Sequence, residues 1–206
     1  MSARVVIITD RAQFATEAIA GRLAAILARV PRGAVAIQIR EKDLDGGPLL
    51  RLAREILGVA RPAGAPVWIN DRVDLALIAG ADGVHLPEHG LPIADARTVA
   101  RGRTLAIGAS RHTEAGVLAA AADGAEVVQL GPIFATPGKQ AVGPAILGVR
   151  ARLPATTRLV AVGGIDSPER AREAAAAGAD AVAVIRAAWT AADPAGLVAA
   201  MIDALH

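Results

Sequence analysis

The chain contains no cysteine, and only 2% of its 206 residues are aromatic. Without cysteine it can form no disulfide framework and carries no thiolate chemistry. Because 53% of the residues are nevertheless hydrophobic, we expect a core made mainly of Val, Ile, Leu and Ala. This length suits one large domain or two small ones, and an α/β barrel of this size forms one domain.

Long apolar runs and basic clusters are also missing. No run of about 18 uncharged apolar residues is present, so the sequence predicts no membrane span. The first apolar stretch meets Asp10 and Arg11 too early for a signal peptide. The sequence pI is about 9.9, but the formal net charge is only +2, and no basic run forms a patch for nucleic acid. We therefore expect a soluble cytoplasmic protein that binds neither membranes nor nucleic acid.

Short β-branched runs alternate with Ala- and Leu-rich segments along the whole chain. Apolar runs without strict alternation are typical of strands buried on both faces. We expect strands at residues 4–9, 34–39, 66–70, 82–86, 104–109, 126–131, 158–163 and 181–186. We expect helices near residues 16–29, 48–58, 72–79, 92–100, 113–122, 144–152, 168–177 and 194–205. Eight strand–helix units favour a closed (β/α)₈ TIM barrel over an open sheet, and the absence of a linker predicts one domain over residues 1–206.

Only two of the 22 basic residues are lysines, and both follow predicted strands. In a TIM barrel the residues after the strands form the active-site face. In QIREKD, Gln38, Arg40 and Lys42 share one side of an extended chain, and two cations with an amide suit a phosphate-rich ligand. Lys139 ends a Gly- and Pro-rich loop in which Thr136 offers a hydroxyl to an oxyanion. Solvated charged loops are the alternative interpretation.

Polar residues and glycines follow three further strands. Asn70 and Asp71 stand where an amide suits a substrate and a carboxylate suits Mg²⁺, although Asp71 with Asp74 also fits an N-terminal helix cap. After the fifth strand, His112 is either a group that exchanges protons near neutral pH or a structural residue. Residues 163–164 are a Gly-Gly pair after the seventh strand, where many barrels bind phosphate.

The stretch HLPEHGLP, residues 85–92, contains His-x-x-Glu-His, the spacing of one class of zinc peptidase motif. Such a site needs both histidines one turn apart on a single helix, and Pro87 would lie inside that helix. His85 is moreover expected in the fourth strand. We therefore expect no zinc site here.

Six segments, in order, resemble the thiamine phosphate synthase family, which includes thiazole tautomerases. They are QIREKD, NDRVDLALIAGADGVHL, GASRHT, LGPIFATPGK, AVGGI and GADAVAVI, and they span nearly the whole chain. The resemblance implies a transferase of thiamine biosynthesis that joins hydroxymethylpyrimidine diphosphate to thiazole phosphate and releases pyrophosphate. It also implies a dissociative reaction, in which Mg²⁺ and fixed cations stabilise the departing pyrophosphate and no general base is needed.

The resemblance assigns a role to each candidate residue. The pyrimidine diphosphate is expected to contact Gln38, Arg40, Lys42, Asn70, Ser110 and Lys139. The thiazole phosphate is expected to contact Thr136, Pro137, Gly138, Gly164, Ile185 and Arg186. Asp71 is the expected Mg²⁺ ligand, and the catalytic candidates are Arg40, Lys42, Lys139 and His112. The expected partners are these two small phosphorylated substrates, and the sequence is compatible with a homo-oligomer.

Three positions depart from the family pattern. Where the family reads His-Leu-Gly-Gln-Glu-Asp-Leu-Pro, with the Asp as the second Mg²⁺ ligand, this chain has Gly90. Glu88, His89 or water are the candidates to fill that coordination position. Gly138 stands where the family has a second Thr, and Arg186 stands where it has a Ser. If backbone N–H groups hold the phosphate, the loss of the Ser is tolerable and Arg186 adds charge.

Two other functions stay open at the level of sequence. A thiazole tautomerase shifts a proton on carboxythiazole phosphate and needs no Mg²⁺; Pro87 and Gly90 resemble that branch, while His112 fits both branches. Lys42 and the pair at residues 70–71 favour the synthase, because a lysine and a carboxylate suit a diphosphate. A non-catalytic regulatory relative would instead bind thiazole phosphate and turn over neither set of substrates.

Overall fold

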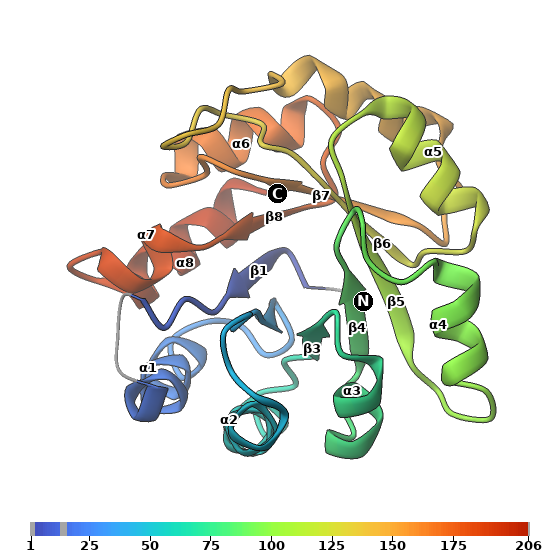
Figure 1. Cartoon of the computed structure of the whole chain (residues 1–206). Helices are drawn as coiled ribbons and strands as arrows, with labels where there is room; N and C mark the ends of the chain where they lie inside the picture. Colours follow the sequence, from blue (N-terminus) through green and yellow to red (C-terminus); the bar gives the residue numbers. More distant parts are fainter. Residues whose placement is uncertain (1–2, 13–15, 206) are drawn as a thin grey trace.

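The structure is a computed structural model that describes residues 3–12 and 16–205. Its strands form a closed barrel in which each strand pairs in parallel with the next and the last returns to the first (Figure 1). The strands are β1 (Val5–Ile8), β2 (Val35–Ile39), β3 (Val67–Asn70), β4 (Gly83–Leu86), β5 (Ala106–Arg111), β6 (Val127–Leu130), β7 (Arg158–Val162) and β8 (Ala181–Val184). The expected (β/α)₈ TIM barrel is confirmed.

Helices follow the strands and ring the barrel (Figure 1). They are α1 (Thr16–Leu27), α2 (Gly46–Ala60), α3 (Val73–Ala79), α4 (Ile93–Val99), α5 (Glu114–Ala122), η1 (Pro144–Arg152), α6 (Pro168–Ala176), α7 (Arg186–Thr190) and α8 (Pro194–Ala204). The weak helix expected near residues 144–152 is a 3₁₀ helix. None of the described helices combines the length and the apolar character that a membrane crossing requires.

The end of the eighth strand differs from the sequence prediction. We expected strand over residues 181–186, but β8 ends at Val184. Ile185 leaves strand geometry, with φ −116° and ψ −94°, and Arg186 begins the additional helix α7. The apolar run AVAVI carries no Gly or Pro to mark this break. Arg186 therefore stands at the start of a helix on the barrel mouth rather than in the barrel wall.

The core has two layers. The larger one lies between the barrel and its helices, and a smaller cluster fills the barrel itself with Val6, Ile8, Ala36, Trp68, Val127, Val160, Ala181 and Ala183. Trp68 takes up much of this interior because Gly83 and Gly108 have no side chains: a Cβ at Gly83 would lie 2.6 Å from Cζ3 of the indole. The lower barrel is therefore filled, and space for a ligand is found above it.

Candidate active site

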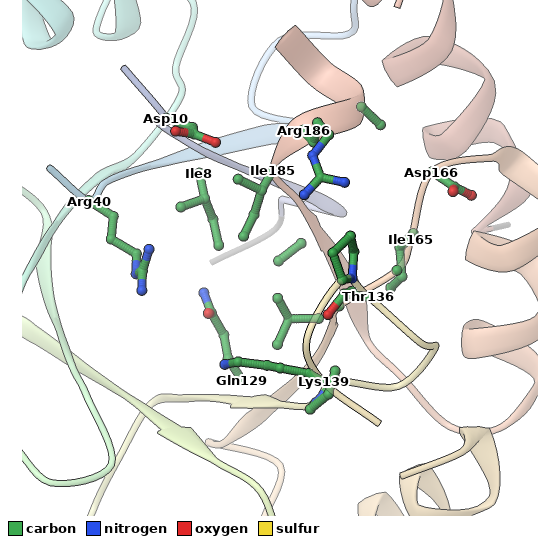
Figure 2. A pocket seen from close by; sticks show the side chains of 18 of the residues that line it. Ile8, Asp10, Arg40, Gln129, Thr136, Lys139, Ile165, Asp166, Ile185 and Arg186 are labelled. Carbon is green, nitrogen blue, oxygen red and sulfur yellow. The ribbon is translucent and has the colours of Figure 1, made fainter. Parts of the chain in front are cut away.

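A cavity of about 790 Å³ opens at the carboxyl ends of the strands (Figure 2). Most of the predicted site residues line it: Gln38, Arg40, Ser110, His112, Thr136, Pro137, Lys139, Gly164, Ile185 and Arg186. This is the face on which TIM barrels build their active sites. These residues lie at or after the ends of five different strands, so the barrel geometry, rather than nearness in sequence, brings their side chains together.

Four predicted residues lie outside this cavity. Lys42 lines a neighbouring hollow of about 530 Å³, which shares Arg40 and Asp10 with the cavity. Asn70 is joined to the cavity lining through a hydrogen bond from Gln38. Asp71 follows β3, and Gly138, with φ +77°, lies at the tip of the loop between Thr136 and Lys139. The alternation that we expected from Gln38 to Lys42 ends early, because β2 stops at Ile39 and Lys42 lies in a turn.

Five cations at the mouth have no salt bridge to a carboxylate in the described part of the chain: Arg40, Lys42, Arg111, Lys139 and Arg186. Elsewhere arginines are commonly paired, as Arg29 is with Asp193 at 2.6 Å. Figure 2 shows Arg40 at the left of the cavity and Arg186 at its upper right. Several unneutralised cations around one cavity favour a site for anions, because charge-assisted hydrogen bonds to phosphate replace the missing partners.

Three amide side chains cross the floor of the site. Gln129 Nε2 on β6 donates to Gln38 Oε1 on β2 at 2.6 Å, and Gln38 Nε2 donates to Asn70 Oδ1 at 3.4 Å. Gln38 is 2% exposed and Gln129 is 5% exposed. Sequence reasoning missed Gln129, although a single amide inside the buried run EVVQLG was a signal that could have found it.

His85, on β4, points into the barrel and is 1% exposed. Its Nε2 lies 2.9 Å from Ser110 Oγ. Burial, together with the positive charges of Arg111 and Arg40, lowers the pKa of His85 to about 3. The imidazole is therefore neutral at ordinary pH and orients the Ser110 hydroxyl.

His112 is held at both ring nitrogens. Nδ1 contacts the carbonyl oxygen of Gly131, and Nε2 lies 3.3 Å from Glu88 Oε2. Since a carbonyl oxygen only accepts, Nδ1 carries the proton of that bond. Glu88 was a candidate to fill the metal position, but its carboxylate contacts His112 instead.

Asp71 follows β3 and does not cap the next helix. The helix cap expected as its alternative role is wrong, since the N-cap of α3 is Arg72 and no side chain caps it. Asp71 holds a left-handed backbone, with φ +65°, and its amide donates to the His85 carbonyl at 2.9 Å. A non-glycine residue in this conformation is uncommon, so the turn presents its carboxylate at some cost in strain.

Gly90 lies beside Asp71, as the family pattern implies. A Cβ built at Gly90 would be 3.0 Å from Asp71 Oδ1 and 2.7 Å from Pro87 Cδ. Gly90 has no positive φ, so Pro87 rather than the backbone opposes a side chain there. In the described residues no group of three or more His, Cys, Asp or Glu side chains could hold a metal. A single carboxylate such as that of Asp71 is chemically compatible with Mg²⁺, which often keeps several waters.

The loops after β6 and β7 form a closely packed wall. Gly163 and Gly164 have φ +96° and +67°, and Cβ atoms there would lie 2.5 Å from Pro132 Cβ and 2.6 Å from Phe134 Cβ. Only glycine fits both the conformation and the space. Arg170, which sequence reasoning also missed, donates to the Gly164 carbonyl at 2.6 Å and lies 5.2 Å from the centre of the Phe134 ring. The backbone of this wall is therefore fixed before any ligand binds.

Comparisons with known proteins agree on one family. A sequence model described as thiamine monophosphate synthase matches residues 5–188. The chain is 42% identical over 193 residues to a putative thiamine-phosphate synthase of Geobacter sulfurreducens, covering 91% of this chain and 87% of that protein. It is 44% identical over 174 residues to the thiamine-phosphate synthase of Methanoculleus marisnigri, covering 81% of each.

A solved structure supports the same assignment. The thiamine phosphate pyrophosphorylase from Pyrococcus furiosus superposes with a TM-score of 0.87 at 29% identity, covering 99% of this chain and 96% of that one. The resemblance carried by the six sequence segments is thereby confirmed. The chain belongs to the thiamine monophosphate synthase family.

Proposed function

We propose that this protein is a thiamine phosphate synthase, a transferase that joins hydroxymethylpyrimidine diphosphate to thiazole phosphate and releases pyrophosphate. One observation carries the proposal beyond family membership: Arg40 and Arg186 line one cavity from different strands, β2 and β8, without carboxylate partners in the described chain. A reaction between two phosphorylated substrates needs two separated anion sites on one cavity, and this arrangement supplies them.

The diphosphate fits the side of the mouth built by the loops after β2 and β3. Arg40 lines both the cavity and the adjoining hollow, and Lys42 lines that hollow. Lys139 reaches the same cavity from the loop after β6. Arginine offers a fork of donors and lysine a compact charge, so the set suits the oxygens of a diphosphate.

The thiazole phosphate fits the wall built by the loops after β6, β7 and β8. Thr136 and Pro137 line the cavity from the loop after β6, Gly164 from the loop after β7, and Ile185 and Arg186 from the start of α7. The glycine-rich backbone allows close approach of an oxyanion, and Arg186 provides a cation where the family pattern has a serine.

The reaction breaks the C–O bond between the pyrimidine methylene and the diphosphate, and both electrons leave with pyrophosphate. The thiazole nitrogen then donates its lone pair to the methylene carbon, so no proton transfer is required. The work of the protein is to stabilise charge on the departing group, which Arg40, Lys42 and Lys139 do as fixed cations. Ser110, oriented by His85, offers a further hydroxyl at the cavity.

Mg²⁺ is part of this proposal. Asp71 would hold it, and a bound Mg²⁺ would neutralise charge on the diphosphate as it leaves. Water would take the position of the family's second carboxylate, because Gly90 offers no side-chain oxygen. The cytoplasmic location, the single domain over residues 1–206 and a homo-oligomer stay predictions.

The tautomerase and the non-catalytic binder are not favoured. The two relatives described above are named as a putative thiamine-phosphate synthase and a thiamine-phosphate synthase. Neither alternative accounts for an unpaired Lys42 in a hollow that adjoins the cavity.

The test is product formation by the full chain from the two phosphorylated substrates, once with Mg²⁺ and once with EDTA. We expect thiamine phosphate and pyrophosphate in equal amounts with Mg²⁺, and little of either with EDTA. Absence of product from the folded protein would overturn the proposal. His112 and carboxythiazole phosphate would then be examined, since the tautomerase needs neither diphosphate nor metal.

A further inference from the structure

Gln129 stands on the cavity floor at a position that neither the sequence motifs nor the proposed chemistry uses. It is the polar member of β6, is 5% exposed, and points its amide into the cavity in Figure 2. A buried amide without partners is costly, so the groups that it contacts are informative.

Its partner comes from across the barrel. β2 and β6 are not neighbours in the sheet, yet Gln129 Nε2 donates to Gln38 Oε1 at 2.6 Å. Gln38 Nε2 then donates to Asn70 Oδ1 at 3.4 Å. The two bonds form an amide relay, Gln129 to Gln38 to Asn70, in which each N–H points from β6 towards β3. In this arrangement Oε1 of Gln38 faces Gln129 and Nε2 of Gln38 faces Asn70.

We propose that Gln129 is a positioning residue that sets the direction of the Gln38 amide and thereby selects the pyrimidine substrate. This inference rests on the proposed function. Gln38 keeps one free lone pair on Oε1 and one free N–H on Nε2 after both relay bonds are made. A carboxamide with both groups free reads an amino group beside a ring nitrogen through two hydrogen bonds, as Gln and Asn read adenine.

The direction of the relay decides which heterocycle matches. With Oε1 on the Gln129 side and Nε2 on the Asn70 side, Gln38 is complementary to a pyrimidine with an amino group next to an unprotonated ring nitrogen. A pyrimidine with an oxo group next to a ring N–H presents the reverse pattern and is mismatched. Because the terminal torsion of glutamine has two nearly equivalent settings, Gln38 alone would not discriminate between the two rings.

Replacing Gln129 should therefore change selectivity rather than merely weaken binding. In Gln129→Glu, the carboxylate at position 129 only accepts hydrogen bonds, so Gln38 turns its N–H towards it and Asn70 turns to donate. The whole relay reverses. In Gln129→Leu the relay is lost, and Gln38 adopts either setting.

The experiment measures kcat/KM for the amino substrate, hydroxymethylpyrimidine diphosphate, and for its analogue with oxo in place of amino. We expect the wild-type chain to prefer the amino substrate. The amino-to-oxo ratio should fall by about a hundredfold in Gln129→Glu and by about tenfold in Gln129→Leu, because a site built to hydrogen-bond a group rejects its mismatch strongly. Gln140→Glu adds the same charge at an exposed position near the mouth and should keep the wild-type ratio within about twofold.

The outcomes separate the two proposals. No product from the wild-type chain would overturn the proposed function, and the relay inference with it. Product formation with an unchanged amino-to-oxo ratio in both Gln129 variants would overturn the relay alone, even if kcat falls. Should Gln129→Glu fail to fold, as judged by its melting temperature, Gln129→Leu decides the matter, because loss of preference is expected there.

Discussion

The loops after β4 and β8 lie at opposite ends of the same barrel mouth, and both depart from the family pattern. Since the closed barrel runs from β1 to β8 in order, these two strands are as far apart around it as strands can be. The loop after β4 has Gly90 where a carboxylate is expected beside Asp71, whereas the loop after β8 has Arg186 in place of a neutral serine. One loop lacks a negative charge and the other has gained a positive charge.

Both differences make the mouth more positive, but their structural settings are not alike. Position 90 is constrained, because Pro87 occupies the space that a side chain would need. Arg186 is unconstrained, because it begins α7 at the cavity edge and no carboxylate in the described chain pairs with it. Packing against Pro87 therefore disfavours a carboxylate side chain at position 90, whereas Arg186 adds a positive charge by extending into open space.

The largest expected effect on activity comes from replacing Asp71, the carboxylate that has no second carboxylate beside it because position 90 is glycine. Asp71→Asn should lower kcat/KM by about a thousandfold and Lys42→Ala by about a hundredfold, since each removes a charge that acts on the departing diphosphate. Asp74→Asn is the matched control: Asp74 pairs with Arg72 at 2.6 Å, away from the site. Near-normal activity in Asp71→Asn would contradict the proposed role of Asp71 as the Mg²⁺ ligand.

A second prediction concerns His85 in β4, the strand that leads into the loop containing Gly90. Its pKa is about 3 in the folded chain against a usual value of 6.5, so the unfolded chain binds the extra proton. Stability is therefore lost as pH falls below about 6.5, by up to about 1.4 kcal/mol per pH unit from this group. In urea denaturation at pH 7, 5.5 and 4.5, the free energy of unfolding should fall less steeply for His85→Gln than for the wild-type chain. Equal slopes would imply that folding does not lower the pKa of His85.

The third prediction restores the missing carboxylate. Pro87→Gly combined with Gly90→Asp should tighten Mg²⁺ binding about tenfold, because it places two carboxylates side by side without the clash at Pro87. Gly90→Asp alone should gain less and be less stable. Calorimetric titration of Mg²⁺ in the presence of inorganic pyrophosphate measures the affinity, and the melting temperature measures stability. An equal affinity in the double variant and the wild type would show that another group already fills the position.

The sequence predicted the barrel well because its signals are local. β-branched runs buried on both faces locate the strands to within one or two residues, as at β2 and β7. The helix α7 was missed because five residues between a strand and a loop carry no period of their own. The winding of η1 as a 3₁₀ helix follows from how the loop after β6 packs, which composition does not encode.

The candidate site was predictable where it depends on strand ends and not where it depends on contacts across the barrel. Arg40, Lys139 and Gly164 follow strands, so their common face could be inferred. The bond between Gln129 and Gln38 joins residues 91 positions apart on strands that are not adjacent, and no spacing rule gives it. The contact of Glu88 with His112 likewise depends on how two loops meet.

We expect the positive charges of Arg40, after β2, and Arg186, after β8, to bind different substrates. The most direct test compares Arg40→Gln with Arg186→Gln, using exposed Arg54→Gln as the control, and measures KM for each substrate separately. We predict that Arg40→Gln raises only the KM for the pyrimidine diphosphate and Arg186→Gln only that for thiazole phosphate. Each should rise about tenfold or more, as expected for a lost charge-assisted hydrogen bond. If Arg186→Gln raised both values equally, or neither, the account of two separate anion sites would be contradicted.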